Sequence, residues 1–206
     1  NNIEIIEKIE KVCKELIGFE IISQTPNISI LKNISIENKD QFDIIFRRFF
    51  LIVKLQSETL VDYCNQKDKK LLKLIISNEL LSNKYSYYLR RLLIKLKPFD
   101  VPQSHNLFVY LWALEQISDS YRNIAKNIIE KNTELNNLII KDTTKLMSKF
   151  YEIYYQNKNQ KNIFEFRKKY KKLKIDLEKN TNYNSQNIYH IIILLEHMST
   201  LLNITN

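Results

Sequence analysis

Two carboxylates have the most informative spacing in the chain for chemistry. Glu115 and Asp119 are four residues apart in a long amphipathic stretch, so on a helix they lie on one face. Like charges at this spacing repel, which calls for a compensating positive charge. A hard cation held by carboxylate oxygens would supply it, and so would Arg122, one turn further on. The pair alone is also typical of a solvated helix face.

The other reactive residue types form no catalytic group. Cys13 and Cys64 are far apart and belong to no CxxC or Cys/His cluster, so the sequence does not predict a zinc site. His190 and His197 are two turns apart, too far to chelate one ion, and His105 follows a candidate helix cap. The single glycine excludes a glycine-rich phosphate loop. We therefore expect a protein that is not an enzyme.

A strongly basic run occupies positions 158–174, and its apolar positions keep helical spacing. The simplest interpretation is the outer face of a helix, and contact with an acidic partner is the alternative. Its central basic residues are Arg167, Lys168, Lys169, Lys171 and Lys172. The net charge of the whole chain is +9, which suits nucleic acid, an anionic membrane or an acidic protein. A composition rich in Lys, Asn, Ile and Tyr, as in AT-rich genomes, explains this charge equally well.

Length and composition indicate a soluble, nearly all-α protein. The 206 residues suit one large or two small domains, and one Gly and three Pro leave few turns. No apolar run reaches the roughly 18 residues of a spanning helix, and no signal peptide is visible. Two lone cysteines suit a reducing compartment, so we expect a cytoplasmic protein without membrane insertion. Because the first residue is Asn rather than Met, we expect a further segment upstream.

The apolar pattern predicts a short N-terminal unit and six long helices. A helix over 3–17 ends at Gly18, and β-rich runs at 19–23 and 28–31 flank Thr25-Pro26-Asn27, which predicts a hairpin. The six helices that follow are predicted at 40–64, 67–96, 104–132, 135–157, 160–179 and 185–204. The predicted seam of the helix at 67–96 is Leu71, Leu74, Leu81, Tyr85, Tyr88 and Leu92.

The breaks between these helices divide the chain. Pro98 and Pro102 predict a turn, with Ser104 as the cap of the next helix. A break near Asn132 leaves three helices on each side, so we expect two three-helix bundles in tandem, over 39–132 and 133–206, after an N-terminal region over 1–38. The sequence at 114–119 is echoed at 195–200, which indicates an internal duplication.

The stretch 114–127, LEQISDSYRNIAKN, resembles the signature helix of the PhoU family of phosphate-uptake regulators. The matching positions are Leu114, Glu115, Ile117, Asp119, Asn123, Ile124 and Ala125. Gln116 and Lys126 depart from the family pattern. Segments 17–21, 47–50 and 85–92 resemble archaeal members, so the resemblance covers about residues 10–130 and is weaker beyond them.

The resemblance implies a fold of two tandem three-helix bundles, with surface metal clusters held by E/DxxxD pairs. It implies a role in restraining or reporting phosphate uptake through contacts with a phosphate transporter or signalling protein. Archaeal members often carry an AbrB-like DNA-binding domain upstream, so DNA contact is expected only through that segment. A homodimer is also compatible with the resemblance.

The acidic motifs that the resemblance implies are incomplete in this chain. Asn78, Ser82 and Thr200 stand where acids are expected. The remaining candidate metal ligands are Glu79, Glu115, Asp119 and Glu196. Because a multinuclear cluster needs many oxygen ligands, we expect at most weak binding of a divalent, iron or zinc ion. The alternatives to a phosphate regulator are a basic nucleic-acid-binding module and a structural interaction module.

Overall fold

The structure is a computed structural model that describes residues 2–38, 40–156, 159–179 and 185–204. Over these residues it is mostly helical, with a short N-terminal helix and one antiparallel hairpin, as predicted. Its elements are α1 (Asn2–Glu15), β1 (Phe19–Gln24), β2 (Ser29–Asn33), α2 (Asp40–Gln66), α3 (Lys69–Leu96), α4 (Val101–Lys131), α5 (Asn137–Tyr155), α6 (Gln160–Lys179) and α7 (Ser185–Ile204). Within the described residues, none of these helices combines the length and the apolar character needed to cross a membrane.

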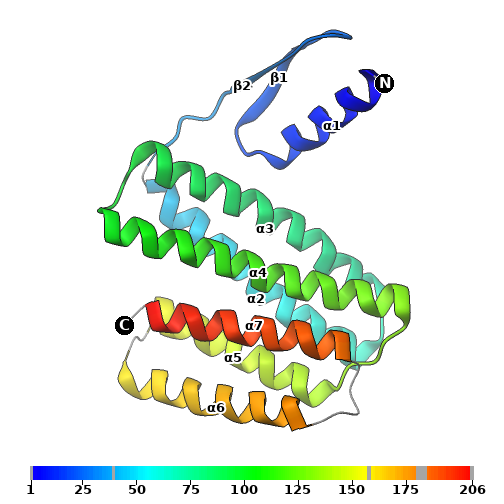
Figure 1. The fold of residues 1–206 in the computed structure, drawn as a ribbon, viewed down its shortest axis with the longest axis vertical. Helices are drawn as coiled ribbons and strands as arrows, with labels where there is room; N and C mark the ends of the chain where they lie inside the picture. Colours follow the sequence, from blue (N-terminus) through cyan, green and yellow to red (C-terminus); the bar gives the residue numbers. More distant parts are fainter. Residues whose placement is uncertain (1, 39, 157–158, 180–184, 205–206) are drawn as a thin grey trace.

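The N-terminal unit, formed by α1, β1 and β2, lies beside α3 (Figure 1). Gly18 joins α1 to the hairpin with φ +81°, and a Cβ there would come within 2.3 Å of Ser35 Oγ, so only glycine fits. Arg91 of α3 links the helices to the segments on either side of the hairpin. Its Nη2 donates to the Ile17 carbonyl at 2.6 Å, and its Nε donates to Glu37 Oε1 at 2.9 Å.

The start of α4 differs from the prediction. Asp100, and not Ser104, is the cap, because its Oδ1 accepts a hydrogen bond from Gln103 N at 2.8 Å. Pro102 lies in the first turn of the helix instead of a preceding loop. Its missing N–H costs nothing there, because the first N–H groups of a helix have no partner in the helix. The predicted end is confirmed, since Asn132 adopts the left-handed conformation directly after α4.

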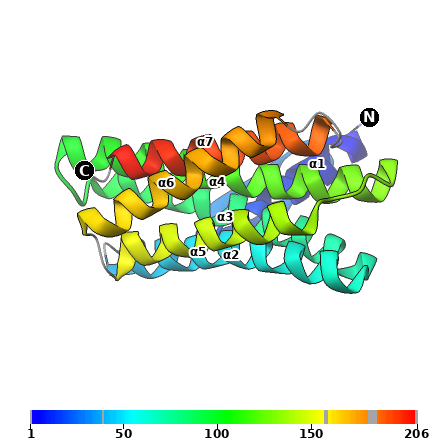
Figure 2. The same cartoon turned by 90° about the horizontal axis from the view of Figure 1, so that it is seen from below.

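The six long helices pack side by side around one hydrophobic core (Figures 1 and 2). Helices α2, α3 and α4 contact one another, and so do α5, α6 and α7. Extensive contacts of α4 with α7 and of α2 with α5 join the two groups. The core therefore continues through both groups. Helix α6 lies at the outer edge, where it contacts α5 and α7 among the described elements.

Aromatic side chains fill much of the contact between α2 and α5. The ring of Phe50 lies 5.1 Å from that of Phe150 and 5.4 Å from that of Tyr151, between centroids. Such pairs contribute about 0.5–1.5 kcal/mol each beyond the burial of their area. Arg47 Nε donates to the Tyr151 hydroxyl at 3.1 Å, which satisfies the polar end of that ring. These contacts hold the two groups of helices together.

The buried face of α3 matches the predicted seam only in part. Tyr88 and Leu92 are buried as predicted, whereas Leu74 and Leu81 are exposed at 44% and 37%. The buried face also carries three polar residues among its apolar ones, namely Glu79, Ser82 and Ser86. The apolar pattern misplaced this part of the seam because α3 turns a polar stripe toward α4, which hydropathy alone assigns to solvent.

Candidate functional site

The polar residues that face each other between α3 and α4 form the candidate site, which we name the α3–α4 seam. It consists of Glu79, Asn83, Ser86 and Arg90 from α3 and Glu115, Asp119 and Arg122 from α4. Within each helix these residues recur every three or four positions, so each set projects from one face. The antiparallel packing of α3 on α4 then brings the two sets together.

Arg122 joins two of the predicted metal ligands. Its Nη1 lies 2.7 Å from Glu79 Oε1 and 3.1 Å from Asp119 Oδ1, so one N–H group serves two carboxylates. The Glu79 side chain is only 2% exposed, and Asn83 Nδ2 donates to its Oε1 at 2.7 Å. Burial raises the pKa of Glu79, and the nearby charge of Asp119 raises it further, against the lowering effect of Arg122.

Glu115 has a separate partner in the same seam. Its Oε2 accepts hydrogen bonds from Arg90 Nη2 and from the Ser86 hydroxyl, the latter at 3.1 Å. The Arg90 guanidinium also lies over the ring of Phe108, 5.5 Å from its centroid. Arg90 is thus held between a carboxylate and an aromatic face. Glu115 therefore pairs with α3 across the seam, whereas Asp119 pairs with Arg122 on its own helix.

These residues do not fit a metal cluster. All three carboxylates of the seam contact guanidinium groups, so each already has a positively charged partner. No group of three or more His, Cys, Asp or Glu side chains suited to a metal ion occurs in the described part of the chain. Arginine is the better match for this donor set, since its planar fork pairs with carboxylates directly.

Glu196, the fourth predicted ligand, lies outside the seam. It accepts a hydrogen bond from Lys174 Nζ on α6, which lowers the pKa of Glu196 and outweighs the opposite effect of burial. Thr200, which stands where an acid was expected, donates its hydroxyl to the Glu196 carbonyl at 3.0 Å. The four predicted ligands are therefore divided among Arg122, Arg90 and Lys174.

The two histidines of α7 lie in different surroundings. Burial lowers the pKa of His190, and the charge of Arg122 lowers it further. The ring of His197 packs edge-on against Trp112 of α4, with centroids 5.0 Å apart. Burial also lowers the pKa of His197. Both rings thus favour the neutral state, and His197 contributes to the contact between α4 and α7.

The basic residues predicted on the fifth long helix lie on the exposed side of α6. They are Arg167, Lys168, Lys169, Lys171 and Lys172. Arg167 Nη2 donates to Asn203 Oδ1 at 2.9 Å, and the four lysines form no ion pair with another described residue. Helix α6 lies on the opposite side of α5 and α7 from α3 and α4 (Figure 1).

No role was predicted for Asn83, Ser86 or Arg90, although all three contact the predicted acids. The sequence feature that could have identified them is the recurrence of polar residues at 79, 82–83, 86 and 90, which forms one polar stripe on α3. A polar stripe of this kind is normally assigned to solvent. Only the position of a second polar stripe on α4 shows that the two pair.

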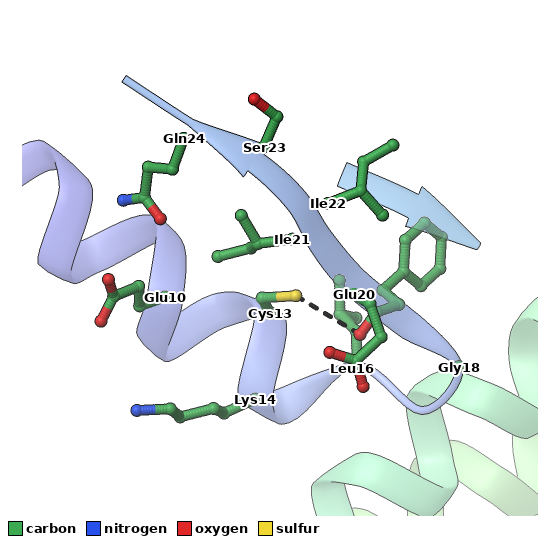
Figure 3. A pocket seen from close by; sticks show the side chains of 11 residues that line it. Glu10, Cys13, Lys14, Leu16, Gly18, Glu20, Ile21, Ile22, Ser23 and Gln24 are labelled. Carbon is green, nitrogen blue, oxygen red and sulfur yellow. Dashed lines mark hydrogen bonds between the residues drawn. The ribbon is translucent and has the colours of Figure 1, made fainter. Parts of the chain in front are cut away.

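A hollow of about 560 Å³ beside α1 and β1 carries no comparable chemistry (Figure 3). Its most reactive group is the thiol of Cys13, which is buried and directs its Sγ to the Phe19 carbonyl at 3.4 Å. Glu10 and Lys14 flank the thiol along α1. This arrangement contributes to the packing of α1 on the hairpin.

Searches of protein-family models, of curated proteins and of solved structures give no match to this chain.

Proposed function

We propose that this chain is a non-enzymatic, PhoU-like regulator of phosphate uptake that acts through contacts with other proteins. One observation carries the proposal. The signature-like helix supplies Asp119, the preceding helix supplies Glu79, and these two acidic positions meet at a single atom, Arg122 Nη1. The resemblance implied acidic motifs on both of these helices, and Glu79 and Asp119 are among the acids of those motifs that this chain keeps.

The proposed architecture is two tandem three-helix bundles, α2–α4 and α5–α7. It is supported by the mutual contacts within each group of three helices. It is also supported by the two related segments at 114–119 and 195–200. Glu115 of the third long helix pairs with Arg90 of the second, and Glu196 of the sixth pairs with Lys174 of the fifth. An internal duplication accounts for this correspondence.

In this proposal the seam is a structural element and not a metal centre. Arg122 and Arg90 supply the positive charge that the acids require, so the helical surfaces stay in place without a bound ion. Regulation then depends on surfaces that reach a phosphate transporter or a signalling protein. A homodimer and DNA contact through an upstream segment are compatible with this role.

The proposal is tested in cells that lack the protein and in cells to which it is restored. We expect phosphate uptake to change on deletion and to return on restoration, and we expect the tagged protein to co-purify with phosphate-transport or phosphate-signalling components. An unrelated helical protein with the same tag controls for adventitious capture. Unchanged uptake together with the absence of such components would contradict the proposal.

A second candidate function is nucleic-acid binding, favoured by the exposed cations of α6. Phosphate contacts give binding that weakens steeply as salt rises. A salt titration of this chain on duplex DNA measures it directly. If the chain does not bind DNA even at low salt, this candidate is eliminated.

A further inference from the structure

The outward side of α6 combines cations with exposed apolar side chains in one stripe, which we name the α6 outer face. At about 100° per residue, this face lies opposite the buried positions Ile163, Phe166, Leu173 and Leu177. Its members are Lys161, Phe164, Lys168, Lys171, Lys172, Ile175 and Lys179, and all are exposed. The helix carries eight basic and three acidic residues, a net charge of +5 within a chain of +9.

Packing leaves this face open to a partner. Helix α6 lies at the edge of the molecule and contacts α5 and α7 among the described elements (Figures 1 and 2). The lysines of the face form no ion pair with another described residue. Lys174 on the flank differs, since it pairs with Glu196 and approaches Glu178. Five lysines without an ion pair to another described residue therefore share one side of α6.

The apolar members distinguish this face from a merely solvated one. Phe164 is 69% exposed and Ile175 is 47% exposed. On a straight helix they lie about 16 Å apart, with Lys168 and Lys171 between them. A hollow of about 430 Å³ lies beside Phe164, between Gln160, Ile163 and Arg167. An exposed aromatic ring next to a hollow and an arginine is the kind of anchor that dominates protein–protein contacts.

We propose that the α6 outer face binds an acidic segment of a partner protein that carries an apolar anchor. The anchor would occupy the hollow beside Phe164, and acidic residues at helical spacing would pair with Lys168, Lys171 and Lys172. The apolar ends favour a protein over a nucleic acid, because Ile175 offers a phosphate backbone nothing to contact. The hollow favours a protein over an anionic membrane, because a lipid surface has no single side chain to insert in it.

This inference rests on the proposed function only in taking the chain to act through contacts with proteins. The two can fail separately. If the acidic segment does not bind but phosphate uptake still changes on deletion, the α6 outer face is not a binding site for such a segment, and the regulatory function is retained. If the segment binds but uptake is unaffected, the proposed regulatory function is wrong, and the binding site is retained.

The experiment measures binding of a fluorescent helical peptide with one Leu followed by three Glu at helical spacing. A matched peptide with Gln in place of Glu is the ligand control. The test variant is Lys168→Glu/Lys171→Glu/Lys172→Glu, and Phe164→Ala removes the ring that lines the hollow for the partner's anchor, without changing charge. The control variant Lys69→Glu/Lys70→Glu/Lys73→Glu makes the same charge change on exposed lysines at the start of α3. Circular dichroism checks that every variant folds.

We expect the Glu peptide to bind more tightly than the Gln peptide. The α6 triple variant should weaken binding by about tenfold or more, Phe164→Ala should weaken it less, and the α3 control should leave it nearly unchanged. Absence of binding to the Glu peptide would overturn the proposal. Equal losses in both triple variants, or tighter binding of duplex DNA or phosphatidylglycerol vesicles than of the peptide, would overturn it too.

Discussion

The α3–α4 seam and the α6 outer face are both rich in charge, but they use it in opposite ways. In the seam, Arg122 and Arg90 pair with three carboxylates, and Glu79 is almost completely buried. On α6, Lys168, Lys171 and Lys172 have no acidic partner among the described residues. Charges paired between helices fix how those helices pack, whereas unpaired charges at the edge remain available to a partner.

Removing Arg122 should cause the largest loss of stability in the α3–α4 seam. Arg122→Ala leaves the carboxylate of Glu79 buried without its guanidinium, and breaking a buried pair from one side is strongly destabilising. Because Arg122 is itself a quarter exposed, we expect a loss of about 2–3 kcal/mol in the free energy of unfolding. Urea unfolding followed by circular dichroism measures it. The double variant Glu79→Gln/Arg122→Ala should recover part of the loss, and no recovery would contradict this account.

Removing Arg90 should have a smaller effect on the same seam. Glu115 retains the Ser86 hydroxyl as a donor and is more exposed than Glu79, so water can replace part of the lost contact. We expect Arg90→Ala to cost about 1 kcal/mol, measured by the same unfolding experiment. A loss larger than that of Arg122→Ala would show that Glu115, and not Glu79, is the centre of the seam.

The raised pKa of Glu79 predicts a pH dependence of stability. As pH rises above 4.5, the unfolded chain releases this proton, while the folded chain keeps it until the raised pKa is reached. The folded state therefore binds more protons in that interval, and the contribution of Glu79 to stability falls as pH rises through it. Glu79→Gln should abolish this part of the fall. Unfolding of both proteins across this pH range tests it, and parallel pH profiles would contradict it.

Reversing the charges of α6 should barely affect folding. In Lys168→Glu/Lys171→Glu/Lys172→Glu all three positions are exposed and unpaired, so we expect a change within about 0.5 kcal/mol in the free energy of unfolding. The effect should appear in binding instead. A destabilisation comparable with that of Arg122→Ala would show that α6 uses these charges in its own packing.

Removing metal ions should have the smallest effect. Because the acids of the seam contact arginines, treatment with a chelator should leave the midpoint of thermal unfolding within about 1 °C. Metal analysis of the purified protein and of Glu115→Ala/Asp119→Ala completes the test. A large decrease in thermal stability on chelation, reversed by a divalent ion, would restore the metal interpretation.

Much of the fold could be predicted from local sequence. The apolar pattern of α4, from Tyr110 to Ile128, matches its buried residues, because an apolar face that repeats every 3.6 residues has one way to face a core. The hairpin followed from two β-rich runs around Pro26, and the left-handed Asn132 marked the end of α4 as predicted. These features depend on residues close together in the chain.

The same pattern misplaced part of the buried face of α3, and it did not identify all the partners of the acids. Leu74 and Leu81 look like core residues, while Glu79 and Ser82 look like surface residues, and the structure reverses both assignments. The acidic pair was predicted to need a positive charge, and Arg122 was one of the two candidates. Burial of Glu79 could not be predicted, because it depends on how α3 is rotated about its axis against α4.

Seven helices, a hairpin, a set of acidic residues and a basic stripe could be predicted from the amino-acid sequence. Which of the charges meet depends on how the helices pack. Arg122 and Glu79 are 43 residues apart in the chain, and Arg90 and Glu115 are 25 apart. Local propensity and periodicity fix a helix and its amphipathic face, but charged side chains pair only after packing sets the distance and rotation between two helices. The same packing places α6 at the edge, which leaves the lysines of its outer face without an ion pair to another described residue.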